Sequence, residues 1–177
     1  PRFSIVTRND NSVMTEDHRE DFLDAIENTI LRHEISHPKI SPNNLGEHLL
    51  VVNPADIHVG KLALAKETGE EYNKDIAKQR VLEGVQGIID RAKGYSVERV
   101  LFCIGNDILH VDNTYNTTTK GTPQDQDGKW WQSFEIALEV YVACVDMLLQ
   151  LGPVDCVHSM SNHDYQSGYH LAHCLKA

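Results

Sequence analysis

The sequence predicts an α/β fold with the element order strand, helix, strand, helix, strand. Three apolar runs have strand character, and the two longer segments between them repeat apolar residues at helical spacing. Such alternation favours parallel strands joined by right-handed crossover connections. All strands then end at one edge of the sheet, which is where open α/β sheets bind ligands.

The three expected strands are short. They cover residues 49–52, 100–104 and 154–158. Pro54 closely follows the first of them. Because proline cannot donate to a sheet ladder, we expect this strand to end at Asn53 or to bulge there.

The two expected helices cover residues 74–93 and 130–150. Gly152 and Pro153 end the second helix. The apolar face expected for the first helix consists of Ala77, Val81, Val85, Ile88 and Ala92. The face expected for the second consists of Trp131, Phe134, Leu138, Val142, Val145 and Leu149.

Residues 1–46 differ from the rest and are predicted to form an N-terminal helical extension and a linker. A helix is expected from Thr15 to about His33, with Phe22, Ile26 and Ile30 on one face. Residues 8–12 are loop-like and residues 37–46 read as a linker. The alternative is the tail of a preceding domain. Residues 47–177 form the main predicted domain.

Composition narrows the class of protein. The net charge of −10 argues against a broad basic surface for nucleic acid, although bound metals would reverse the charge at a local site. No apolar run is long enough to span a bilayer, so no membrane partner is expected. The four cysteines lack CxxC spacing, and we expect reduced, buried thiols in a cytoplasmic protein.

A polar motif follows each expected strand. Carboxylate, imidazole and amide groups of this kind can hold divalent metals beside a phosphate ester, and carboxylate with imidazole suits Mn, Fe, Zn or Ni better than Ca. The motifs are Asp56-Ile57-His58, then Gly105-Asn106-Asp107 followed by His110, then Ser161-Asn162-His163-Asp164.

Each motif alone has a structural alternative. Asp107 fits a helix N-cap, and residues 162–164 fit a plain turn. A structural zinc site is a further alternative, although the spacing matches no standard zinc pattern. Its ligands would come from His158, His163, His170, His173, Cys156 and Cys174. The joint occurrence of three motifs at one sheet edge favours the catalytic interpretation.

Residues 112–129 form a long polar stretch directly after the second motif. Loops of this length inside a compact domain are usually functional or disordered. The stretch therefore either contacts a substrate or is merely solvated.

The ordered motifs resemble those of the calcineurin-like metallophosphoesterases over about residues 47–165. That family carries Asp-x-His, then Gly-Asp, then Gly-Asn-His-Asp/Glu. His110 is similar to the extra histidine of the DNA double-strand-break repair nuclease branch. Phage phosphoesterases of the repair-exonuclease-like kind are also similar, particularly around residues 119–123.

The resemblance implies a role for each motif residue. Asp56 and His58 would bind one metal, Asp107 would bridge two, and Asn162 would bind the second. His163 would protonate the leaving oxygen as a general acid. Asp164 or His110 would orient His163.

The resemblance also implies the cofactors and the reaction. We expect two divalent metals, with manganese favoured over Fe, Zn, Ni or Mg, and water activated for attack on a phosphodiester. DNA is the expected substrate, which makes the protein a nuclease. The alternatives are a phosphomonoesterase, a small-nucleotide phosphodiesterase, and a non-catalytic binding module with a degenerate metal site.

Three departures from the family pattern shape these expectations. Asn106 is inserted between the family's Gly and Asp, and Ser161 replaces the usual Gly. Two later metal motifs, a lone His and Gly-His-x-His, are not evident. We therefore expect the N-terminal half of a metallophosphoesterase-type sandwich, incomplete as a catalyst. Its uncovered apolar face would allow a homo-oligomer.

Overall fold

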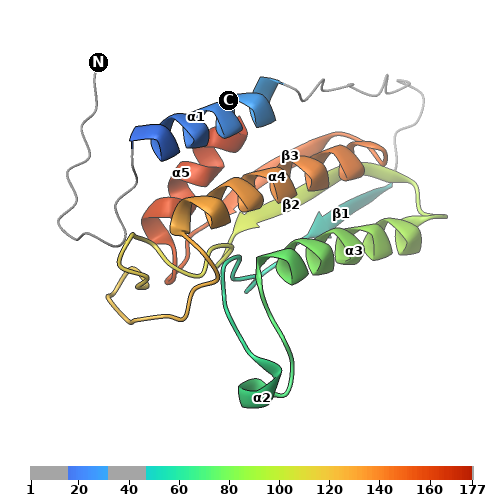
Figure 1. Ribbon diagram of the computed structural model, residues 1–177. Coiled ribbons are helices and arrows are strands. Elements are labelled where there is room, and N and C mark those ends of the chain that lie inside the picture. Colours follow the sequence, from blue (N-terminus) through green and yellow to red (C-terminus); the bar gives the residue numbers. More distant parts are fainter. Residues whose placement is uncertain (1–15, 32–46, 177) are drawn as a thin grey trace.

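A three-stranded parallel sheet forms the centre of the protein (Figure 1). The structure, a computed structural model, describes residues 16–31 and 47–176. The strands are β1 (His48–Val52), β2 (Val97–Gly105) and β3 (Val154–Ser159), in the spatial order β1-β2-β3. The predicted α/β class and parallel pairing are confirmed. The expected loop at residues 8–12 and linker at residues 37–46 lie outside the described residues.

Helix α3 (Lys74–Ala92) joins β1 to β2, and α4 (Trp130–Leu149) joins β2 to β3. Short α2 (Ala65–Thr68) lies at the tip of an excursion between β1 and α3 (Figure 1). Helices α1 (Glu16–Leu31) and α5 (Tyr165–Lys176) complete the described elements. No helix among these residues is long and apolar enough to cross a membrane.

The predicted helical faces are partly wrong. In α3 the buried residue is Ile89 rather than Ile88. In α4 the buried residues are Tyr141, Cys144 and Leu148, each one position before a residue predicted to be buried. In α4 a step of four residues drifts by about 40° around the helix, so extending the stripe from Leu138 to Val142 leaves the core face. In α3 the buried stripe itself continues in a step of four from Val85 to Ile89, and the predicted step of three to Ile88 leaves it.

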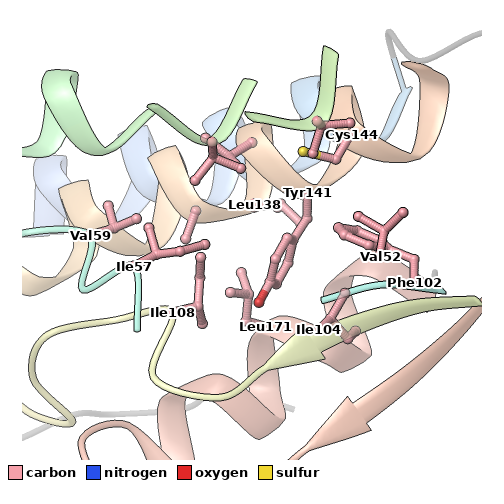
Figure 2. Packing of buried hydrophobic residues seen from close by; sticks show 14 of the residues in the cluster. Val52, Ile57, Val59, Phe102, Ile104, Ile108, Leu138, Tyr141, Cys144 and Leu171 are labelled. Atoms are coloured by element: carbon pink, nitrogen blue, oxygen red, sulfur yellow. The ribbon is translucent and has the colours of Figure 1, made fainter. Parts of the chain in front are cut away.

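Tyr141 connects α4 to the sheet beneath it. Its ring packs edge-on against Phe102, with 5.9 Å between the centroids, and its hydroxyl accepts the Gly105 N–H at 2.6 Å. Figure 2 shows Leu171 of α5 and Ile108 of the loop after β2 in the same cluster. The core therefore reaches directly beneath the end of β2.

The opposite face of the sheet carries apolar residues beside the Arg99–Asp155 ion pair and is uncovered in the described part of the chain. Val51 pairs with Leu101, and Cys103 pairs with Val157, which places all four on this face. Val51 is 54% exposed and Val157 is 44% exposed. Parallel sheets are usually covered on both faces, so this surface matches the uncovered apolar face expected from the sequence.

The predicted contact of the N-terminal helix with the core is confirmed, whereas the predicted burial of the cysteines is confirmed only in part. Phe22 of α1 packs edge-on against Trp130 and Phe134, so the predicted N-terminal helix contacts the core. The four cysteines are free, as expected, but only Cys144 is fully buried. Cys156 is exposed because edge strand β3 is incompletely covered.

Gly105 ends β2 in a conformation that a side chain would disturb. Its φ is +89°, and a Cβ would lie 2.1 Å from the Ser159 carbonyl oxygen. Gly105→Ala is expected to lower the free energy of unfolding by about 3 kcal/mol, because the left-handed backbone costs about 1–2 kcal/mol and the clash adds to it. Urea denaturation measures the loss.

Gly94→Ala is the matched control for this substitution. Gly94 has a φ of +100° but no atom within 4 Å of an added Cβ. The free energy of unfolding of Gly94→Ala is expected to fall only by the backbone contribution of about 1–2 kcal/mol. Equal losses in the two variants would show that the contact with Ser159 has no energetic weight.

Candidate metal centre

Backbone hydrogen bonds hold the first two motifs side by side at the sheet edge. The Asp56 N–H donates to the Asn106 carbonyl at 3.0 Å, and the Val59 N–H donates to the Ile108 carbonyl at 2.7 Å. These bonds continue the parallel pairing of β1 and β2 beyond Val52, where β1 ends before Pro54. The sequence therefore correctly places both motifs at one edge.

Asp107 connects the second motif to the third. Its Oδ1 accepts the N–H groups of Asn162 at 3.0 Å and His163 at 2.9 Å. The Asp107 N–H donates to the Ser161 hydroxyl oxygen at 2.7 Å. The Ser161 side chain thus supplies an acceptor that a glycine at this position would lack.

The first motif alternates between the core and the candidate site. Ile57 and Val59 are 7% and 0% exposed and pack in the core, as Figure 2 shows. The intervening Asp56 and His58 side chains lie on the opposite side of the loop, with 78% and 17% exposure. The apolar residues anchor the loop, and the polar residues are thereby held at the sheet edge.

The backbone of the site is strained at four positions. Asp56, His58, Asn106 and Asp107 have φ values of +55°, +51°, +58° and +63°. Among the described non-glycine residues, only Asn116 shares this left-handed conformation. Asn, Asp and His tolerate it best, and strain of this kind clusters at functional sites.

Two groups of potential metal ligands form at this edge. Asp56, His58 and Asp107 offer ligand atoms that all lie within 4.8 Å of one another, and so do His58, His110 and His163. His58 belongs to both groups, and its Nε2 lies 3.8 Å from Asp56 Oδ1. The first group unites three of the four predicted metal ligands.

Asn162, the fourth predicted ligand, lies at the rim of the site. It is exposed, and its backbone N–H points to Asp107. Metal binding through its side-chain oxygen stays a prediction. Of the histidines in the zinc alternative, only His163 belongs to a possible metal group within the described residues.

The His110 carbonyl orients His163. It accepts a hydrogen bond from His163 Nδ1 at 2.9 Å, because a carbonyl can only accept. His163 Nε2 is thereby left as the nitrogen available for a proton or a metal. Asp164 and His110 were the two residues expected to orient His163, and the contact comes from His110, through its main-chain carbonyl.

Burial keeps two of the imidazoles neutral. Burial, together with the neighbouring His58 and His163, lowers the pKa of His110 to about 4. Burial also lowers the pKa of His58, assisted by His163 and opposed by Asp107 and Asp56. Neutral imidazole is the form that binds metal, so both rings are ready to do so near pH 7.

Asp164 lies beneath the site rather than in it. The residue is fully buried, and its Oδ2 accepts the Leu109 N–H at 2.9 Å. Burial raises the pKa of its carboxyl to about 6, although the hydrogen bond from Leu109 lowers it. These contacts make Asp164 an anchor for the loop that carries Asp107 and His110.

This carboxyl gives the free energy of unfolding a pH dependence. Its pKa rises from 3.8 in the unfolded chain to about 6 in the folded chain. Between these values the folded state retains a proton that the unfolded state has lost, so stability falls as pH rises and levels off above the folded pKa. Asp164→Asn is expected to remove this fall of roughly 3 kcal/mol.

Urea denaturation at a series of pH values, in metal-free buffer, measures this effect. Asparagine keeps an oxygen acceptor for the Leu109 N–H, so the variant is expected to fold. An unchanged pH dependence in Asp164→Asn would assign the effect to another group.

A cavity of about 610 Å³ lies beside the first motif and is lined by Asp56, His58, Lys61, Tyr72 and Arg80, among others. Lys61 Nζ lies 6.0 Å from the centroid of the Tyr72 ring, and Arg80 Cζ lies 5.4 Å from it. Sequence reasoning missed these three residues. The one feature of the sequence that could have indicated this cavity is Lys61, a cation three positions after His58.

The long polar loop is attached to the third motif. The Thr119 N–H donates to the His163 carbonyl at 3.2 Å. Asp112 Oδ1 accepts the Ser167 N–H at 2.7 Å, at the start of α5. Residues 112–129 thus lie at the candidate site, as the sequence predicts.

Comparison with known proteins adds no family assignment. Family models, curated proteins and solved structures all yield no match to this chain.

Proposed function

We propose that this chain belongs to a metal-dependent phosphoesterase that hydrolyses phosphodiester bonds, with DNA as the expected substrate. The observation that carries the proposal is the convergence of Asp56, His58 and Asp107 at the sheet edge. Two carboxylates with one imidazole suit manganese or iron, and this edge is the usual ligand site of α/β sheets.

Asp56, His58 and Asp107 would hold the first metal, and Asp107 and Asn162 would contribute to the second. When bound, the metals would supply Lewis-acid activation of water and neutralise charge on the phosphate. One Asp107 oxygen already accepts two N–H groups. The other oxygen is the one open for metal binding.

His163 is the general acid in this proposal. Its Nδ1–H donates to the His110 carbonyl, so Nε2 carries the proton for the leaving oxygen when the ring is in its imidazolium form. His110 and Asp164 act as positioning residues through the carbonyl and through the anchored loop. Lys61 and Arg80 line the adjacent cavity, where Arg80 is paired with Glu70 at 3.3 Å. Lys61 is therefore the cation proposed to face a phosphate despite the net charge of −10.

A small-nucleotide phosphodiesterase is the second candidate. The cavity of about 610 Å³ beside Asp56 has the size of a small-molecule site, and Tyr72 offers an aromatic face within it. A nucleoside placed there would bring its phosphate to the metal ligands. Long DNA needs no such cavity.

An activity panel with manganese tests the proposal and separates the two candidates. The substrates are single- and double-stranded DNA, a dinucleotide, bis(p-nitrophenyl) phosphate and p-nitrophenyl phosphate. Hydrolysis of the diesters that is lost in Asp56→Ala supports the proposal. Preference for the monoester overturns the diesterase assignment, and manganese binding without any hydrolysis favours a non-catalytic module.

Residues 1–177 alone are expected to be a weak catalyst. Asp56 and Asp107 are the only carboxylates in the proposed ligand set, and two-metal sites use further ligands to fix coordination. Partial manganese occupancy, measured by metal analysis after gel filtration, is the expected result. Robust activity of this form, abolished by Asp56→Ala, would contradict that expectation.

A further inference from the structure

Three histidines from three separate segments form one cluster of rings. His58, His110 and His163 follow β1, β2 and β3, and their ligand nitrogens all lie within 4.8 Å of one another. The His58 ring centroid lies 5.2 Å from that of His110 and 4.4 Å from that of His163. His110 and His163 are stacked, with 5.5 Å between their centroids.

The cluster contains buried nitrogens without partners. Nδ1 of His58 and Nδ1 of His110 are buried and make no hydrogen bond within the described part of the chain. Buried polar atoms in folded proteins are nearly always satisfied, so these two atoms require an explanation. Neither is satisfied by the carboxylates of Asp56 and Asp107.

The third ring already has the orientation of a metal-binding histidine. His163 Nδ1 donates to the His110 carbonyl at 2.9 Å, which leaves Nε2 as an electron-pair donor. Metal-binding histidines typically donate their second nitrogen to a carbonyl or carboxylate in this way, which fixes the tautomer. His110 thus contributes its ring to the cluster and its carbonyl to the orientation of a neighbouring ring.

We infer that His58, His110 and His163 form a zinc site of their own, distinct from the carboxylate site of Asp56 and Asp107. Three neutral imidazoles suit zinc and its transition-metal neighbours, whereas magnesium, calcium and manganese prefer oxygen ligands. Three protein ligands leave a fourth tetrahedral position open to water or an anion. The favoured interpretation of the sequence assigns only His58 of these three to a metal, and the structural-zinc alternative names His163 with other partners.

Zinc at this site would regulate the proposed reaction. Because both ligand sets contain His58, full coordination at both would need both nitrogens of that ring. Zinc would also occupy Nε2 of His163, the proposed general acid. Inhibition of manganese-dependent hydrolysis by zinc therefore rests on the proposed function, whereas zinc binding does not.

Zinc affinity of the metal-free chain, measured by competition with a chromophoric chelator, tests the binding. His110→Ala is expected to weaken zinc binding at least about a hundredfold, since changes outside a ligand set already cost roughly 10–100-fold. His163→Ala is expected to do the same. Cobalt in place of zinc is expected to give the intense visible bands of a four-coordinate ion, and both variants should lose them.

Two control variants locate the site. Asp56→Asn lies outside the imidazole cluster and is expected to keep zinc while losing manganese. His170→Ala changes an exposed histidine of α5 and is expected to alter neither affinity. Circular dichroism confirms the fold of each variant, and His163→Ala decides the outcome if His110→Ala does not fold.

Specific results would overturn the inference. Zinc affinity that survives both His110→Ala and His163→Ala excludes this site, and so does a loss in Asp56→Asn equal to the loss in the histidine variants. Absence of hydrolysis with any metal defeats the proposed function but leaves the binding result intact. Zinc binding at the cluster without inhibition of measurable hydrolysis defeats the regulatory part alone.

Discussion

Asp107→Asn is expected to weaken manganese binding by at least about a hundredfold and to lower kcat/KM by about a thousandfold or more. The substitution removes the negative charge between the two proposed metal positions. Asparagine keeps an oxygen that can accept the N–H groups of Asn162 and His163, and it tolerates the φ of +63° at this position. The loss would therefore come from charge rather than from loop geometry.

Isothermal titration calorimetry with manganese measures the affinity, and diester hydrolysis measures kcat/KM. Asp125→Asn is the matched control, since it removes an exposed carboxylate from the polar loop outside both ligand groups. It is expected to bind manganese like the unaltered chain. Wild-type manganese affinity in Asp107→Asn would show that the carboxylate group at the sheet edge is not a metal site.

His163→Ala is expected to lower kcat roughly 10²–10⁴-fold while manganese affinity stays unchanged. The reason is that His163 lies outside the group of Asp56, His58 and Asp107 and has its Nε2 free for proton transfer. Only the protonation of the leaving oxygen depends on it in the proposed mechanism. Steady-state kinetics and manganese titration on the same preparation separate the two effects.

The leaving group gives a sharper test of this role. A p-nitrophenolate leaving group needs little protonation, so bis(p-nitrophenyl) phosphate is expected to lose much less activity in His163→Ala than DNA does. His170→Ala is expected to leave both reactions unchanged. Equal losses on both substrates, or loss of manganese from His163→Ala, would assign His163 to metal binding in the active enzyme instead.

Local sequence patterns suffice for the framework of this protein. Helical periodicity predicts α3 and α4 to within one residue at each end, and the apolar runs predict all three strands. Parallel topology then brings Asp56, Asp107 and His163 to one edge, because strand ends at that edge follow from the order of elements. The candidate ligands could thus be found without knowledge of any distance.

Other features depend on contacts between distant segments and could not be predicted. The burial of Asp164 follows from its hydrogen bond to Leu109, 55 positions away in the sequence. The His110 carbonyl can orient His163 only because the segment after β3 places that ring beside it. Neither contact can be predicted from local spacing, because Asp164 and His163 are polar residues in a segment predicted to be a turn.

The hydrogen bonds that Asp107 accepts from Asn162 and His163 also bear on how the chain folds. They join residues 55 and 56 positions apart, so they can form only after β2 and β3 have paired around α4. Closing such long loops is entropically costly, and contacts of this kind tend to form late. A metal that binds only the completed edge stabilises the native state without aiding its assembly. Bound manganese is then expected to lower the unfolding rate and to leave the folding rate unchanged.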